Sequence, residues 1–189
     1  MKASCTRCFL GYDEGMKHPV VYVVCAVAAL SVVLIVWSQT FVAPMRLTST
    51  AFGEGERIPE KYTCDGENVN PPLAVRDVPK GTKSLTITMI DPDVPKTPWV
   101  HWLVYGLDPG TEIVENMKFD IASEGMTSFK KSAYGGPCPP SGKHHYIFTA
   151  YAVSTPMVFH KAPDINGLKR AMKGNVLGRA ELTGIYYHP

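Results

Sequence analysis

The chain has 189 residues, of which 45% are hydrophobic, 19% charged and 10% aromatic, so it holds enough apolar material for a domain with a core and is not wholly disordered. Its formal net charge is only +2, from 19 Lys and Arg against 17 Asp and Glu, which gives no strong excess of positive charge and argues against a nucleic-acid-binding protein. The 16 Gly and 16 Pro favour a turn-rich β protein over a helical bundle.

The first predicted element is an apolar segment near the N-terminus. Residues 20–37 read VVYVVCAVAALSVVLIVW and contain no charged residue. A helix needs about 20 apolar residues to span a bilayer, whereas the apolar region of a cleaved signal peptide is usually shorter. We therefore expect a transmembrane anchor at residues 19–38, after a tail at residues 1–18 and before a linker at residues 39–47. A cleaved signal peptide is the main alternative; a buried core helix is another, but no amphipathic stripe favours it.

Basic residues are distributed unequally around this segment. Lys2, Arg7, Lys17 and His18 precede it, whereas Arg46 is the only base just after it. By the positive-inside rule the N-terminal tail is cytoplasmic, and the rest of the chain lies outside the cytoplasm or in a lumen. We expect a single-pass membrane protein, or a secreted protein if the segment is cleaved.

Five cysteines are too few for a small domain held together by disulfides. Cys5 and Cys8 form a CxxC before the apolar segment, but no second Cys or His pair lies near, so no zinc site is expected there. Palmitoylation or ordinary free thiols are the alternatives. Cys64 and Cys138 would lie on the translocated side, where an even pair suggests a disulfide, although the sequence does not show whether the two come within reach.

Strands are predicted where short runs of β-branched and aromatic residues lie between turn formers. Such runs occupy residues 84–90, 101–107, 146–153 and 182–187. A helix is predicted after Asp164, because Ile165, Leu168 and Met172 follow at helical spacing and Asp is a favoured N-cap. The predicted fold class is mainly β: an antiparallel Greek-key β-sandwich with short peripheral helices, preceded by one transmembrane helix.

Three loop segments gather polar groups. Residues 91–95 (DPDVP) hold two carboxylates close together after a predicted strand, although Asp before Pro is also a common turn starter. Residues 99–102 (WVHW) contain one His, a type more often packed in the core than used as a ligand. Residues 134–146 are rich in Gly and Pro and place His144 and Tyr146 two residues apart, on one face of a strand.

Some functions are excluded by details of these segments. Gly142-Lys143 is followed by His, and nearby prolines lack the N–H groups that cradle phosphate, so a P-loop is excluded. The sequence contains no GxSxG motif, which argues against a serine hydrolase. Metal-ligand types are present in Asp91, Asp93, His101 and His144. Spacing alone does not separate a metal site from an anion site made of His and Tyr donors.

The same segments resemble a known family. DPDxP at residues 91–95, a His at the start of an apolar strand, and GPxPPxGxHxY at residues 136–146 resemble the phosphatidylethanolamine-binding protein family. The likeness is greatest to its bacterial and archaeal Raf kinase inhibitor-like branch, which residues 58–66 (IPEKYTCDG) and 70–73 (NPPL) also match. The resemblance runs from about Thr48 to Tyr187.

The resemblance places a domain at residues 48–189 and implies an antiparallel sandwich with a small pocket at one end. In the family this pocket takes phosphate-like or carboxylate anions, including phospholipid head groups. Carried over by position, the ligand-binding residues are Asp91, Asp93, Trp99, His101, Gly136, Pro137, His144 and Tyr146. The branch also fits a bridge between Cys64 and Cys138. His145 stands where the family usually has Arg, at a position expected to point away from the pocket.

We therefore expect a membrane-tethered binding protein for small anions or phospholipid head groups. No activated nucleophile accompanies the His, Tyr and Asp side chains, so no enzyme activity, cofactor or metal is expected. The alternative function is an inhibitor or regulator that docks on a protease or kinase-type partner. A third hypothesis is a hydrolase with an Asp–His acid–base pair.

Overall fold

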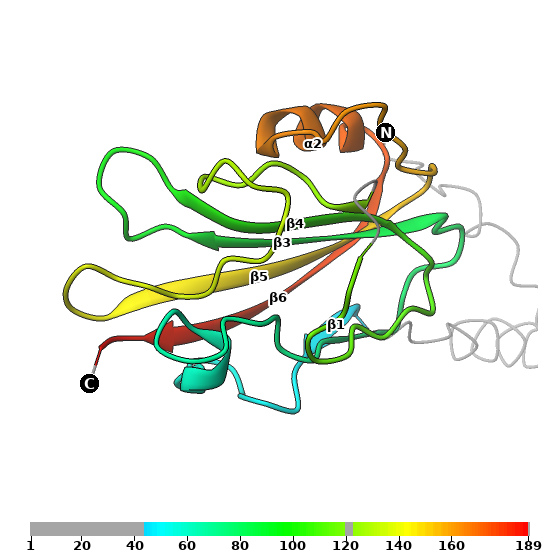
Figure 1. The fold of residues 1–189 in the computed structure, drawn as a ribbon. Helices are drawn as coiled ribbons and strands as arrows, with labels where there is room; N and C mark the ends of the chain where they lie inside the picture. Colours follow the sequence, from blue (N-terminus) through cyan, green and yellow to red (C-terminus); the bar gives the residue numbers. More distant parts are fainter. Residues whose placement is uncertain (1–43, 120–122, 189) are drawn as a thin grey trace, which may run out of the picture. The chain divides into compact units, whose positions relative to one another are not determined.

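A computed structural model describes residues 44–119 and 123–188 (Figure 1). These residues form six strands, one α-helix and one short 3-10 helix. In chain order the elements are β1 (Arg46–Thr48), η1 (Glu60–Tyr62), β2 (Ala74–Arg76), β3 (Ser84–Asp91), β4 (Trp99–Leu107), β5 (His144–Val153), α2 (Ile165–Met172) and β6 (Val176–Tyr186).

The main sheet contains four antiparallel strands in the order β4-β3-β5-β6. The inner strand β3 is buried at nearly every position, because both faces of the sheet are covered. Asp91 ends β3, Trp99 begins β4 and His144 begins β5, so these three residues lie at the same end of the sheet (Figure 1).

Side chains from the two faces of the sheet enter two separate hydrophobic clusters. On β4, Trp102 and Val104 belong to one cluster and Leu103 and Tyr105 to the other, as expected for side chains that alternate along a strand. The first cluster is completed by residues of the 44–75 region, and the second by residues of α2. Figure 1 shows this region and α2 on opposite sides of the sheet.

The predicted strands are confirmed: three agree with the observed bounds to within two residues, whereas the last, predicted at residues 182–187, begins six residues earlier, at Val176. The predicted helix is also confirmed: the Asp164 side chain accepts a hydrogen bond of 2.7 Å from the Gly167 backbone N–H at the start of α2. The sequence analysis missed β1 and β2. These two strands pair only with each other, so the second layer of the expected sandwich is a two-stranded sheet with irregular segments.

The predicted transmembrane segment, residues 19–38, lies outside the described residues. Within residues 44–119 and 123–188, no helix combines the length and the apolar character that a membrane span requires.

Candidate binding site

A β-bulge positions the first functional side chain, that of His101. Met89 of β3 pairs with Trp102 of β4, but the next residue, Ile90, pairs with Val100. His101 is therefore an extra residue without a partner on β3, and such bulges change the direction of a side chain relative to a regular strand. His101 is 4% exposed, so the bulge places an imidazole in the interior at the end of the sheet.

The His101 ring is oriented by the loop before β5. Its Nδ1 lies 2.7 Å from the Gly135 carbonyl oxygen, and because a carbonyl only accepts, Nδ1 carries the proton and donates. Burial lowers the pKa of His101 below its usual value, partly offset by the Gly135 carbonyl and by the nearby Asp91 carboxylate. The imidazole is thus predominantly neutral at pH 7, and its Nε2 offers a lone pair.

Asp91 holds the second histidine, His144. Asp91 is only 2% exposed, and both of its side-chain oxygens accept hydrogen bonds. Its Oδ2 accepts from His144 Nδ1 at 2.7 Å, and its Oδ1 accepts from the Asp93 backbone N–H at 2.8 Å. The second bond is an Asx-turn, which explains why an Asp suits the position before Pro92. As at His101, the occupied Nδ1 leaves Nε2 of His144 available.

Tyr146 packs against the first of these two histidines, His101. Its ring packs edge to face against His101, with 5.2 Å between the ring centroids, and the residue is 0% exposed. The hydroxyl lies near the Cys138 backbone but makes no hydrogen bond of good geometry to a described residue. Burial and the neighbouring Asp91 carboxylate raise the pKa of Tyr146, so its hydroxyl is a permanent proton donor.

Asp93 accepts no hydrogen bond from His101 or His144 in the structure, unlike Asp91, which binds His144. Its Oδ2 accepts from both Nδ1 and the backbone N–H of His145, at 2.7 and 2.8 Å, and the two side chains are partly exposed. Burial alone would raise the pKa of Asp93, but the His145 hydrogen bonds outweigh it and the pKa is lowered. His145, at a position expected to point away from the pocket, thus orients the second carboxylate of the DPDVP turn.

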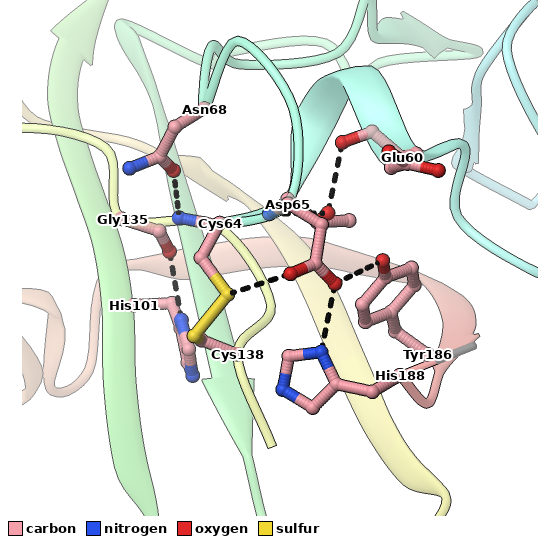
Figure 2. The surroundings of a disulfide bond; sticks show 11 residues. Glu60, Cys64, Asp65, Asn68, His101, Gly135, Cys138, Tyr186 and His188 are labelled. Carbon is pink, nitrogen blue, oxygen red and sulfur yellow. Dashed lines mark hydrogen bonds and ion pairs between the residues drawn. A yellow bond between two sulfur atoms is a disulfide. The ribbon is translucent and has the colours of Figure 1, made fainter. Parts of the chain in front are cut away.

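The loop before β5 is fixed to the 62–68 segment by a disulfide and several hydrogen bonds. A disulfide joins Cys64 to Cys138, with an S–S distance of 2.09 Å (Figure 2). The Cys64 backbone N–H donates to the Pro137 carbonyl at 3.0 Å, and the Gly136 N–H donates to Asn68 Oδ1 at 2.7 Å. These connections fix the Gly135 carbonyl that orients His101.

Aromatic side chains form one wall beside His101. Phe129 packs edge to face against both Trp99 and His101, with centroid distances of 5.4 and 5.3 Å. Trp99 is therefore near the site but does not touch the polar groups in any contact that the structure shows. Its contribution is an apolar boundary.

The structure thus brings together Asp91, His101, His144 and Tyr146 at one end of the sheet, with Gly136 and Pro137 in the adjacent loop. The roles of Asn68, Gly135, Phe129 and His145 were missed by the sequence analysis. Asn68 had one local signal: its φ of 55° lies in the left-handed region, which Asn tolerates better than most residues. A surface cavity of about 500 Å³ lies away from these groups, toward the other end of β5, between Tyr151 and α2.

Comparison with known proteins gives consistent matches over the described domain. A family model described as phosphatidylethanolamine-binding protein matches residues 48–187. A UPF0098 protein of Methanothermobacter thermautotrophicus is 40% identical over 148 residues, which cover 75% of this chain and 98% of the relative. A UPF0098 protein of Chlamydia trachomatis is 39% identical over 147 residues, with 75% and 98% covered.

Two solved structures match the same part of the chain. The phosphatidylethanolamine-binding protein homologue CT736 from Chlamydia trachomatis aligns with a TM-score of 0.73 at 38% identity, covering 77% of this chain and 99% of that chain. YbcL from E. coli, described as a member of the mammalian family, aligns with a TM-score of 0.71 at 28% identity, covering 78% and 100%.

Proposed function

The chain belongs to the phosphatidylethanolamine-binding protein family, and on that premise we propose that its domain is a non-catalytic binding module for a small anion such as phosphate or a phosphoryl head group. One observation carries the proposal: Tyr146 has a fully buried hydroxyl without a hydrogen-bond partner among the described residues, beside two histidines whose Nδ1 atoms are already bonded. A buried donor without a partner costs free energy, and a bound oxygen atom would satisfy it.

The protonation of the two histidines sets the chemistry of the ligand. In their neutral forms both present Nε2 as an acceptor, and only Tyr146 donates. A fully ionised anion would therefore meet two lone pairs and the negative Asp91. A ligand that keeps one acidic proton, such as hydrogen phosphate or a phosphate monoester, donates a hydrogen bond to Nε2 and accepts one from the Tyr146 hydroxyl. The site should therefore prefer the protonated form of the ligand to the fully ionised form.

The same geometry supports a binding role rather than catalysis. No Ser, Cys or Lys accompanies His101 and His144 in the contacts that the structure shows, and the raised pKa of Tyr146 keeps it a phenol. A general base without a side-chain nucleophile beside it does not complete a covalent mechanism.

We also propose that residues 19–38 anchor the protein in a membrane, with the domain outside the cytoplasm. Residues 45–47 of the predicted linker belong to the folded domain, since Met45 is buried and β1 begins at Arg46, and the six residues 39–44 span about 20 Å when fully extended. The domain would then stay close to the lipid surface, where phospholipid head groups are available to the site.

An NMR titration of the full chain in a non-ionic detergent tests the anion site. Phosphorylethanolamine should cause saturable shifts of the His101 and His144 ring protons, and His144→Ala should weaken binding at least tenfold. His160→Ala, at an exposed histidine in the loop before α2, is the matched control and should bind normally. Absence of saturable shifts, or equal binding by His144→Ala, would contradict the proposal.

Membrane anchoring is tested separately by fractionation. The full chain should remain in the membrane fraction after an alkaline wash, whereas a chain without residues 1–38 should be released. If the full chain is released as well, anchoring is wrong, whatever the anion titration shows.

A further inference from the structure

A second cluster of side chains that can bind a metal consists of the two disulfide cysteines and a histidine, and it shares no residue with the anion site proposed above. Cys64 Sγ, Cys138 Sγ and one ring nitrogen of His188 all lie within 4.8 Å of one another. They come from three separate segments: the loop after η1, the loop before β5 and the tail after β6 (Figure 2). The fold therefore brings a histidine to a disulfide that already joins two distant loops.

His188 is held in this place by Asp65. Asp65 Oδ2 accepts from His188 Nδ1 at 2.8 Å and from the Tyr186 hydroxyl at 2.6 Å. The Tyr186 ring is buried and packs against the Arg57 guanidinium, 5.2 Å from its centroid.

This hydrogen bond also decides which His188 nitrogen is available. Because Nδ1 keeps its proton and donates it in a hydrogen bond to Asp65, the neutral imidazole has its lone pair on Nε2. A carboxylate that accepts from one ring nitrogen while the other binds a metal is a recurrent arrangement in metalloproteins, where it fixes the tautomer and makes the imidazole more basic. Figure 2 shows Nδ1 directed at Asp65 and the second ring nitrogen on the side away from Asp65.

The oxidised cysteines are poor metal ligands, because thiolates, not disulfide sulfurs, bind transition metals. Reduction of the disulfide supplies the two thiols. A dithiol reductant transfers two electrons and two protons to the bridge, so that the S–S bond becomes two thiols and the reductant becomes a disulfide. A divalent ion that binds the two sulfurs then releases their two protons to solvent.

We propose that reduction of the Cys64–Cys138 bridge creates a site for a thiolate-binding transition metal, of which Zn²⁺ is the representative ion. The ligands are Cys64 Sγ, Cys138 Sγ and His188 Nε2, and a water molecule completes the coordination. Zn–S bonds of about 2.3 Å and Zn–N bonds of about 2.0 Å place such ligands within about 4 Å of one another. The Cα atoms of the two cysteines are 5.4 Å apart, so small side-chain rotations suffice.

The site is accessible from solvent. The His188 side chain is 42% exposed, and Cys138 lies on an exposed part of its loop. Both the reductant and the metal ion can therefore reach it without opening the core. This inference does not depend on anion binding at Asp91, His101, His144 and Tyr146.

Cobalt binding tests the proposal, because a Co²⁺–thiolate bond gives a charge-transfer absorption band. The full chain would carry Ser in place of Cys5, Cys8 and Cys25, so that no other thiol contributes. After reduction with a phosphine, which takes up the oxygen of one water while the bridge gains two hydrogens, one Co²⁺ per chain should bind and Zn²⁺ should displace it. The oxidised protein should give no charge-transfer band.

Two variants separate a built site from loose thiol binding. His188→Ala should weaken Co²⁺ binding at least tenfold, and Asp65→Ala should weaken it by about 10-fold or more, as expected for the loss of an orienting carboxylate. The matched control His160→Ala should bind normally. The proposal is overturned if the reduced chain gives no thiolate band, if His188→Ala binds equally well, or if reduction alone abolishes the β-sheet circular dichroism, since the site requires the fold.

Discussion

His144 donates a hydrogen bond of 2.7 Å from Nδ1 to Oδ2 of Asp91, 53 residues earlier in the chain. The bond connects the end of β3 to the start of β5, and it is almost fully shielded from water: the side chains are 12% and 3% exposed. Since the other Asp91 oxygen accepts from the Asp93 N–H, one buried carboxylate orders both a turn and a histidine.

Replacing Asp91 should therefore destabilise the fold. Asp91→Ala leaves two shielded donors without a partner, and we expect a loss of about 2–4 kcal/mol in the free energy of unfolding. Asp91→Asn should cost less, because the amide oxygen still serves one donor. Urea unfolding followed by circular dichroism measures both. Pro92→Ala, at the exposed next residue, is the control; an Asp91→Ala change no larger than that of the control would contradict the assignment.

Tyr146→Phe separates a ligand-binding hydroxyl from a structural one. The hydroxyl has no hydrogen-bond partner among the described residues, so its removal should change the free energy of unfolding by less than about 0.5 kcal/mol. Phosphate binding should weaken about tenfold, because a buried donor to the anion is lost. Calorimetric titration with phosphate, beside urea unfolding, measures both. A large loss of stability with unchanged binding would mean that the hydroxyl serves the fold.

The sequence patterns that predicted most of the fold are local, so they do not reveal elements that depend on pairing with distant residues. Runs such as residues 84–90 carry their own strand signal, and the helix after Asp164 has both its cap and its apolar spacing in one short segment. By contrast, β1 and β2 have three residues each and are stabilised by pairing between residues 26 to 30 positions apart, from Thr48↔Ala74 to Arg46↔Arg76, which no local pattern indicates.

The candidate site was predictable to the extent that motifs mark it. The residues Asp91, His101 and His144 were named from the family-like motifs, but the bulge that directs His101 depends on the register between β3 and β4. Asn68 and His188 act through contacts with residues 68 and 123 positions away, at Gly136 and Asp65. Such pairings depend on the tertiary fold, so the sequence alone did not indicate them.

The pH dependence of stability should report the buried His101. Its pKa is lowered in the folded protein, so below about pH 6.5 the unfolded chain binds a proton that the folded protein does not. The free energy of unfolding should therefore fall as the pH drops below about 6.5, and this loss continues until the folded-state pKa is reached. Urea unfolding across this range measures it.

His101→Asn is the matched variant for this pH series, because its amide N–H can still donate to the Gly135 carbonyl. The variant should lose less stability between pH 7 and pH 5 than the parent protein does. Added phosphate should also reduce the parent's loss if the anion stabilises the protonated ring. Identical pH profiles for parent and variant would show that His101 does not titrate in this range.

Gly136 should be required for the close contact between two loops. An added Cβ would collide with the Tyr62 carbonyl oxygen and lie 2.8 Å from Asn68 Oδ1 and 2.9 Å from Thr63 Cα. Two of these neighbours are backbone, which moves less easily than a side chain. We expect Gly136→Ala to cost about 1–3 kcal/mol of unfolding free energy. Gly110→Ala, where a Cβ meets no atom within 4 Å, should cost less than about 0.5 kcal/mol.

Removal of the disulfide should destabilise the fold and weaken anion binding together. The bridge closes a loop across a sequence separation of 74, and in the chain-entropy model its loss costs about 4 kcal/mol. Cys64→Ser/Cys138→Ser should therefore unfold at a lower urea concentration than the oxidised parent. The bridge also holds the loop whose Gly135 carbonyl orients His101, so phosphate affinity should fall in the folded variant as well.

The phosphine-reduced parent in a metal chelator should match the variant in both measurements. A double variant with parental stability would show that the hydrogen bonds between the two segments, such as Cys64 N–H to Pro137 and Gly136 N–H to Asn68, are sufficient to fix the loop.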